Sequence, residues 1–280
     1  MKITKNNFEK NIFKNGSKTY FTSSLFFPKD KRLAVYKLYS FVRLADDFVD
    51  EIPQNKTAFL LLKNSYQKKA SNVPIVSIKK VLQNIYDLQK EYKISNVEIK
   101  AFLCSMEMDL KKQKYITMDD TLRYIYGSAE VIGLMMSKII GLNKESYKYA
   151  KYQGRAMQYI NFIRDIDEDI KLGRCYFPYN IRLKYGLKSW NENIVTNNGF
   201  ELFLKEQIEQ YYTWQQKAKK GWKYLPYRSR IAVITASDGY NWTAKKIYNN
   251  PAIVFNKKVK PSKAILLLFA CKNFIKAVFY

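Results

Sequence analysis

The chain has 280 residues, 47% of them apolar, so it is long enough to bury a large hydrophobic core. It has only 10 glycines and 7 prolines and no sustained alternation of apolar and polar residues, which argues against an all-β fold. Its 49 lysines and arginines against 24 acids give a formal charge of +25. That charge favours nucleic acid, anionic lipid or phosphorylated small molecules as partners, although a general preference for surface lysine would produce it too.

Apolar residues recur at the 3.6-residue spacing of amphipathic helices through most of the chain. The first clear helix is predicted to begin after Pro28, where Asp30 can cap the free amides, and to end near Pro53. Further helices are predicted at 56–70, 75–92, 95–112, 118–141, 144–172, 200–224, 228–248 and 261–278. No repeat, low-complexity tract or linker divides the sequence, so residues 1–280 are predicted to form one all-α domain.

The cysteines and the chain start indicate the compartment. Cys104, Cys175 and Cys271 are far apart and odd in number, which fits neither a disulfide framework nor a metal quartet, and a reducing cytoplasm is expected. The first twenty residues contain five lysines and no long apolar run, unlike a signal peptide. The longest apolar run, Ala264–Cys271, is far shorter than the ~20 residues that span a membrane.

Two short segments concentrate the acidic residues of this basic chain. Residues 43–51 (RLADDFVDE) and 161–169 (NFIRDIDED) each contain four acids. On a helix that turns ~100° per residue, each segment forms one polar stripe. The first stripe contains Tyr36, Tyr39, Arg43, Asp46, Asp47 and Asp50, and the second contains Gly154, Gln158, Asn161, Asp165, Glu168 and Asp169. The other faces are apolar, which suits burial in a helical bundle.

The spacing of the acids favours a bound cation. Asp46 and Asp50, like Asp165 and Asp169, lie four residues apart, repel each other and have no basic residue one turn later. We therefore expect their countercharge to come from elsewhere, and a divalent cation would supply it. Oxygen ligands and the absence of histidine favour Mg²⁺, which usually combines one or two carboxylates with substrate phosphate oxygens. A solvated charged face is the alternative.

At these residues the sequence resembles the squalene/phytoene synthase family, in the family's order and over nearly the whole chain. The family's first motif, Asp-x-x-x-Asp after an arginine, is matched by Arg43, Asp46 and Asp50. Its second motif, Gln-x-x-Asn-x-x-x-Asp-x-x-x-Asp, is matched by Gln158, Asn161, Asp165 and Asp169. Residues 173–178 (GRCYFP) look like the family's Gly-Arg-x-Tyr-Phe-Pro turn.

Weaker matches extend the resemblance. Ser17, Lys18, Thr19 and Tyr20 are similar to a family segment that contacts diphosphate. Residues 124–133 (YIYGSAEVIG) resemble a helix whose first tyrosine lines the reaction cavity, but Ser128 and Glu130 replace its valine and glycine. Tyr240 lies where the family has a cavity tyrosine, and Lys257 or Lys258 where many members have a phosphate-binding arginine.

The resemblance implies an isoprenoid-synthase-type helical bundle around a central cavity. It also implies head-to-head joining of two prenyl diphosphates through a cyclopropylcarbinyl diphosphate. The implied cofactor is Mg²⁺, two or three ions with Mn²⁺ as a substitute, held by Asp46, Asp47, Asp50, Asn161, Asp165 and Asp169. The implied catalytic residues are Tyr39, Arg43, Tyr124 and Tyr240. The implied substrate-binding residues are Ser17, Lys18, Thr19, Tyr20, Gln158, Arg164, Lys257 and Lys258.

Several alternatives stay open. The short length of the chain and the sequence of its first motif favour formation of phytoene from geranylgeranyl diphosphate. Formation of squalene or dehydrosqualene from farnesyl diphosphate is the alternative. A head-to-tail synthase or terpene cyclase would share Asp46-Asp47-x-x-Asp50 but not the second motif. A basic nucleic-acid binder is supported by the charge alone, and neither nucleic acid nor an obligate protein partner is expected.

Arg164 and the C-terminal stretch each allow two interpretations. Arg164 could contact phosphate, or it could pair with Asp167 or Glu168 on its own helix. The apolar, lysine-containing stretch Ala264–Tyr280 could rest on the inner face of a membrane. Alternatively it is a core helix that turns its large apolar side chains inward, namely Leu266, Leu267, Phe269 and Phe274.

Overall fold

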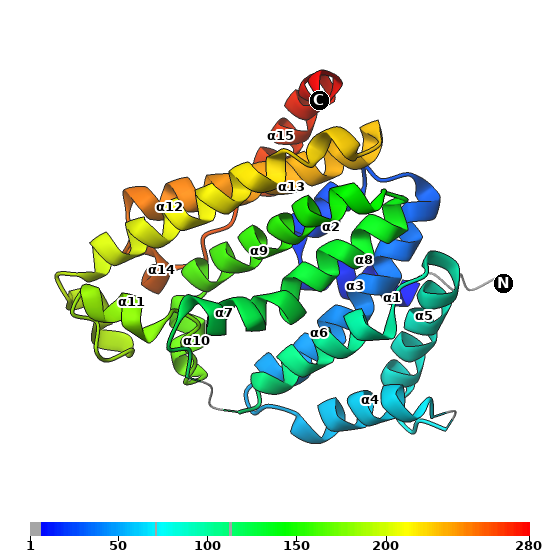
Figure 1. The fold of residues 1–280 in the computed structure, drawn as a ribbon, viewed down its shortest axis with the longest axis horizontal. Helices are drawn as coiled ribbons and strands as arrows, with labels where there is room; N and C mark the ends of the chain where they lie inside the picture. The colour runs from blue at the N-terminus through cyan, green and yellow to red at the C-terminus, as the bar shows by residue number, and fades with distance from the viewer. Residues whose placement is uncertain (1–6, 71, 112–113) are drawn as a thin grey trace.

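The computed structural model describes residues 7–70, 72–111 and 114–280, and within these ranges the chain folds into helices without strands (Figure 1). The first helices are α1 (Asn7–Gly16), α2 (Lys18–Ser24), α3 (Lys29–Asp50), α4 (Lys56–Lys68), α5 (Val76–Tyr92) and α6 (Asn96–Met108). The middle ones are α7 (Met118–Ile125), α8 (Val131–Ile140), α9 (Tyr147–Arg164), α10 (Ile166–Lys171) and α11 (Tyr179–Lys184). The last are α12 (Phe200–Lys219), α13 (Tyr227–Asn249), α14 (Ile253–Asn256) and α15 (Lys263–Lys276). The all-α prediction is confirmed.

Local capping explains several helix starts. The side chains of Ser95 and Thr117 accept from the backbone at the starts of α6 and α7, each completed by an acid three residues on. At α3 the predicted cap is wrong. Pro28 occupies the N-cap position without a side-chain hydrogen bond, and Asp30 lies in the first turn, where its charge favours the helix dipole. Residue 112, the predicted end of the fourth helix, lies outside the described residues.

Helix α9 occupies the middle of the molecule and packs against α8, α12 and α13 (Figure 1). Helix α3 packs against α1, α4, α5, α6 and α8. Both belong to one cluster of buried apolar side chains, which includes Phe41 of α3 and Tyr159 of α9. The first acidic segment and the beginning of the second, which continues into α10, are therefore carried by helices of the interior. The division into one domain over residues 1–280 stays a prediction.

The predicted helix 118–141 is interrupted by a π-helical turn, Tyr126–Glu130. Close packing accompanies this turn. A Cβ at Gly127 would lie 2.3 Å from the carbonyl oxygen of Ala101 on α6, and a Cβ at Gly154 of α9 would lie 2.3 Å from that of Ala129. Glycine is therefore required on both sides of the turn, because any side chain would push the neighbouring backbone away.

Glu130, the last residue of this turn, departs from the family pattern. Its side chain is buried, with Arg155 2.6 Å and Lys151 3.3 Å from its carboxylate oxygens. A buried carboxylate needs such partners, because desolvation without them costs several kcal/mol. The departure is thus compensated by two cations from α9.

The predicted helix 144–172 is also interrupted, at Asp165, whose φ of −102° and ψ of 19° separate α9 from α10. Neither proline nor glycine lies there. The backbone hydrogen bonds from Asp165 to Asn161 (2.8 Å) and from Asp169 to Asp165 (2.9 Å) are kept. The second acidic stripe therefore bends without being broken apart.

The C-terminal helix differs from the expected core helix. Leu266 is buried as predicted, but Leu267 and Phe274 expose 44% and 45% of their surface. Within the described residues, no helix is long and apolar enough to cross a membrane. All three cysteines are free thiols, as expected.

Candidate active site

Helix α3 places its motif acids around one arginine. Arg43 lies 3.2 Å from Asp46 and 2.6 Å from Asp47, one helical turn along. Burial raises the pKa of Asp46 well above its usual range, and repulsion from Asp50 adds to this, against the opposing effect of Arg43. Asp46 nevertheless keeps 35% of its side-chain surface accessible, so a ligand can reach it. The ionised form of Asp46 is therefore disfavoured, and a bound cation would stabilise it.

The second motif is also surrounded by cations. Arg164 lies 2.5 Å from Asp165, and Lys258 approaches Asp165 to 3.3 Å and also contacts Glu168. Burial opposes ionisation of Asp165, but Arg164 and Lys258 outweigh it and lower the pKa of the carboxyl. Arg164 thus pairs with Asp165 rather than with Asp167 or Glu168, and Asp167 pairs with Lys171 instead.

These pairs show that the chain itself supplies part of the countercharge at the acids. Four cations of the chain lie on the motif carboxylates: Arg43, Arg164, Arg174 and Lys258. Spacing along one helix could not reveal two of these cations, because Arg174 and Lys258 come from other segments. Within the described ranges, no group of three or more acidic, histidine or cysteine side chains is arranged to hold a metal ion.

The two motifs nevertheless converge on one place. The pKa of Asp169 is raised well above its usual range, first by burial, then by repulsion from Asp165 of its own motif and from Asp50 of the other. Arg174, in the turn after α10, lies 2.5 Å from Asp50 and also donates to the carbonyl oxygen of Val49. This turn, matched as Gly173–Pro178, therefore ties the end of α3 to the end of α10.

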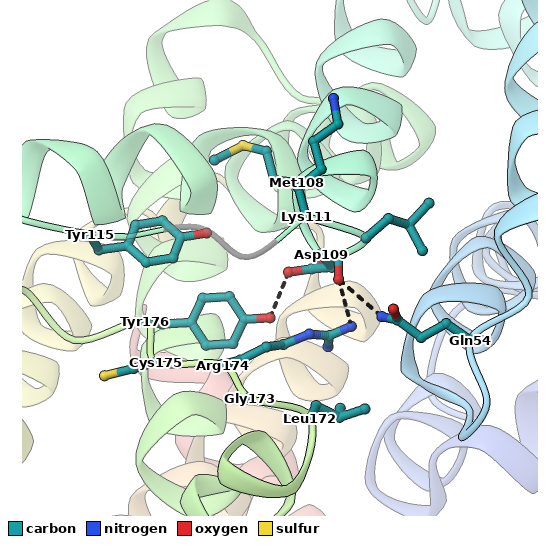
Figure 2. Close-up of a pocket in the computed structure, with 11 residues that line it drawn as sticks. Gln54, Met108, Asp109, Lys111, Tyr115, Leu172, Gly173, Arg174, Cys175 and Tyr176 are labelled. Carbon is teal, nitrogen blue, oxygen red and sulfur yellow. Dashed lines mark hydrogen bonds between the residues drawn. The ribbon is translucent and has the colours of Figure 1, made fainter. Parts of the chain in front are cut away.

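Sequence reasoning missed Asp109, which lies at the centre of this junction (Figure 2). Its carboxylate accepts from Tyr124 Oη at 2.6 Å and Tyr176 Oη at 2.7 Å, and its carbonyl oxygen accepts from Arg174 and Gln54. Burial raises the pKa of Asp109 to about 7, although Arg174 and the two tyrosines act to lower it. Its local sequence, Met108-Asp-Leu110, carries no charge pattern that would have singled it out.

A cavity of about 160 Å³ opens beside Asp109. Its lining includes Gln54, Tyr115, Arg174 and Tyr176, and Figure 2 shows the Tyr176 hydroxyl and the Arg174 guanidinium pointing to Asp109. The junction between the motifs is thus reachable from outside the protein.

The predicted tyrosines fall into two groups. Tyr240 and Tyr20 share a hydrogen bond of 2.7 Å between their hydroxyls, and both lie within the electrostatic influence of Arg164. Tyr39 stacks on Phe13, with ring centroids 3.9 Å apart, one turn before Arg43. Tyr124 belongs elsewhere, because its hydroxyl donates to Asp109 in the other group.

The remaining candidates occupy varied positions. Ser17 caps α2 by accepting from the Tyr20 amide at 3.2 Å, whereas Lys18 is exposed and Thr19 is half-buried. Gln158 is half-buried on α9, and Lys257 is exposed. Asn161 differs from these. Its Oδ1 atom is buried and has no hydrogen-bond partner among the described residues.

Sequence comparison identifies the family. A squalene/phytoene synthase family model matches residues 13–264. A 15-cis-phytoene synthase from Pantoea ananas is 29% identical, with 91% of this chain and 87% of that protein covered. One from Enterobacter agglomerans is 30% identical, with 91% of both proteins covered.

Fold comparison agrees. A dehydrosqualene synthase crystal structure, determined with a ligand, superposes with a TM-score of 0.75 at 21% identity, covering 97% of this chain and 96% of the other. A ligand complex of the protein TcSQS gives 0.77 at 18% identity, covering 97% and 88%. These structures share the helical fold. The sequence match and the paired acidic motifs together establish that the chain belongs to the squalene/phytoene synthase family.

Proposed function

We propose that the chain joins two geranylgeranyl diphosphates head to head to form phytoene, an early step of carotenoid biosynthesis. The observation that carries this proposal is the convergence of the two acidic motifs, where Arg174, which follows the second motif, lies 2.5 Å from Asp50 of the first. Acids from distant segments gather beside Arg43, Arg164 and Lys258. Such a mixture of carboxylates and cations suits a diphosphate and its counterions.

The donor set fits Mg²⁺, with Mn²⁺ as a substitute. Its members supply only oxygen ligands, which hard cations prefer: Asp46, Asp47, Asp50, Asn161, Asp165 and Asp169. The buried Oδ1 of Asn161 has no partner among the described residues, and the pKa values of Asp46 and Asp169 are raised by burial and by like charges. Since no three acids form a ready-made site in the described ranges, substrate phosphate oxygens would complete the coordination.

When bound, the ions would stabilise the charge that develops on the departing diphosphate. Arg43, Arg164 and Lys258 contribute to the same task, because each is held at the acidic motifs by a carboxylate. A guanidinium fork binds phosphate in two places, whereas Lys258 acts as a point charge.

The tyrosines hold protons next to the leaving group. Burial raises the pKa values of Tyr20 and Tyr240, so both phenols stay protonated and the pair stays hydrogen-bonded.

Each of the two half-reactions releases one diphosphate and one proton, so phytoene formation needs no reductant. The aromatic rings of Tyr20, Tyr39 and Tyr240 can also stabilise an allylic cation.

We propose further that the protein works in the cytoplasm at a membrane surface. Its substrate carries a long hydrocarbon tail and its product is entirely apolar, so both partition into lipid. The thiols of all three cysteines are free, which fits a reducing compartment.

The test is a product assay. Purified protein is incubated with Mg²⁺ and either geranylgeranyl or farnesyl diphosphate, with and without NADPH, and the hydrocarbon is identified. Phytoene from the first substrate without NADPH is the expected result. Squalene or dehydrosqualene from farnesyl diphosphate as the main product would assign the C30 reaction instead, and absence of any hydrocarbon would remove the proposal.

Variants test the site itself. Asp46→Asn and Asp165→Asn should fold normally by circular dichroism but lose on the order of 100-fold or more in turnover, as expected when electrostatic stabilisation of a leaving group is removed. The matched control is Asp167→Asn, because Asp167 lies on α10 but pairs with Lys171. Equal losses in all three variants would contradict the assignment.

A further inference from the structure

Helix α15 and the turn that follows it, Ala277–Phe279, present an apolar row to solvent. Leu268, Ile275 and Phe279 expose 69%, 71% and 82% of their surface, and Leu267, Phe274 and Val278 are also exposed. The opposite side of the same segment is buried against the protein through Leu266, Ala270 and Ala277. Figure 1 shows α15 at one edge of the molecule, beyond α13. A contiguous row of this kind marks an interaction surface.

Two neighbouring segments widen this row into a patch. The ring of Phe26, between α2 and α3, lies 5.7 Å from that of Phe274. Tyr227, at the start of α13, is 43% exposed and donates its hydroxyl to the Phe274 carbonyl oxygen at 2.6 Å. We call this surface the C-terminal patch. It consists of the exposed side chains of α15 and of the turn that follows it, together with Phe26 and Tyr227.

The charges around the patch are mostly positive, and Asp238 of α13 contacts α15 only on its buried side, where it accepts from Asn273 at 2.9 Å. From Gly239 to Tyr280 the chain contains eight lysines and no aspartate or glutamate. Lys263, Lys272 and Lys276 belong to α15 itself. Lys219 lies over the ring of Tyr280 and Lys276 over that of Trp222, so further positive charge lies near the end of the helix. An occupant must therefore be both apolar and anionic.

We propose that the C-terminal patch docks on an anionic lipid bilayer. Its apolar side chains would enter the boundary between headgroups and acyl chains while the lysines contact the headgroups. With 14 residues, α15 is too short to span a bilayer and would lie in the plane of the surface. A second copy of the chain is a poorer occupant, because it would bring the same lysines and the same +25 charge.

The position of the patch relates it to the candidate active site. Helix α15 packs on α2 and α13, which carry Tyr20 and Tyr240. Its buried Leu266 approaches Gly239, next to Tyr240, so closely that an added Cβ there would lie 3.0 Å from it. Docking would place these tyrosines one helix away from the lipid. The inference rests on the membrane contact proposed above and assigns a surface to it, whereas the argument for the patch does not depend on the proposed reaction.

The experiment is vesicle flotation of the full chain. We expect it to float with vesicles of phosphatidylcholine and phosphatidylglycerol at least ~10-fold more than with phosphatidylcholine alone, and to be released by salt. Leu268→Asn with Ile275→Asn should lower flotation by ~10-fold or more, because two apolar side chains that would enter the bilayer are replaced by polar ones. Lys272→Gln with Lys276→Gln should weaken binding to the anionic vesicles only.

The matched control is Val76→Asn with Val97→Asn, which changes two residues of α5 and α6 that are 79% and 69% exposed. This variant should float like the parent protein. Circular dichroism and melting temperature check that every variant is folded. Flotation equal to the parent in the Leu268/Ile275 variant, or no flotation of the parent on anionic vesicles, would overturn the proposal. A parent dimer that this variant dissociates would instead assign the patch to contact between copies.

Discussion

The aspartates of the two motifs differ in their neighbours, and their pKa values differ accordingly. Asp165 has Arg164 and Lys258 beside it, which overcome burial and lower its pKa. Asp169 lies one turn further and is surrounded mainly by other acids, so burial and repulsion raise its pKa. Identical residue types therefore start from different protonation equilibria, and Asp169 depends more than Asp165 on a bound cation for its ionised form.

A prediction at this scale concerns Asp109. Its pKa is about 7 in the folded chain against an ordinary value of 3.8. Between these two pH values the folded state holds a proton that the unfolded chain has released, so the stability that Asp109 contributes falls as pH rises from about 4 to about 7. Asp109→Asn has no such proton. From pH 4.5 to 7.5, the free energy of unfolding of this variant should therefore rise relative to that of the parent by roughly 1–4 kcal/mol.

The measurement is urea unfolding at several pH values in the presence of a chelator, which removes metal effects. Val76→Asn is a suitable control, because Val76 is 79% exposed and neither side chain titrates, so the pH dependence of stability should be unchanged. The prediction fails if the parent and Asp109→Asn show parallel pH profiles.

At the scale of elements, the interruptions of two long helices shape the site. The π-helical turn Tyr126–Glu130 brings α6 and α9 against a backbone where only glycine fits, at Gly127 and Gly154. The change of direction at Asp165 turns α10 and its acids away from the line of α9. Two of the four cations beside the acids, Arg174 and Lys258, come from turns that follow helices. Turns at helix ends thus add positive charge beside the acids.

A prediction at this scale concerns Gly154→Ala. The added Cβ would lie 2.3 Å from the Ala129 carbonyl oxygen, and backbone cannot move aside as a flexible side chain can. We expect the variant to lose about 1–3 kcal/mol of stability in urea unfolding, although alanine favours helices more than glycine does. The control is Lys148→Ala, an exposed position on the same helix, for which we expect a change within about 0.5 kcal/mol. An alanine variant at 154 as stable as the parent would show that α9 can shift.

At the scale of the whole molecule, the acidic motifs act together only because the fold brings together segments more than a hundred residues apart. Arg174 spans this separation by contacting Asp50 and Val49. The chain as a whole carries a formal charge of +25 with these acids included, so anionic substrates are attracted to it from a distance. The acids thus form a local site where metal ions can bind, while the positive charge of the whole chain still attracts a diphosphate.

The prediction at this scale is cooperative binding of metal and diphosphate. Because Mg²⁺ usually combines one or two carboxylates with phosphate oxygens, Mg²⁺ with inorganic diphosphate should raise the melting temperature by roughly 5 °C or more, and Mg²⁺ alone by much less. Differential scanning fluorimetry measures this without catalysis. Asp46→Asn and Asp165→Asn should abolish the rise, and Asp167→Asn should keep it. A full rise with Mg²⁺ alone would contradict shared coordination.

The sequence by itself determined the all-α class, most helix positions and the two acidic motifs, because helical periodicity and charge spacing are local properties of the chain. It left out α1, α2, α11 and α14, and it did not indicate the interruptions near Gly127 and at Asp165, which depend on packing and on backbone geometry. Only the tertiary structure showed that Asp109 joins Tyr124, Tyr176 and Arg174, and that Arg174 and Lys258 neutralise the motif acids. Such contacts join segments far apart in sequence, and no local pattern encodes which distant side chain will arrive.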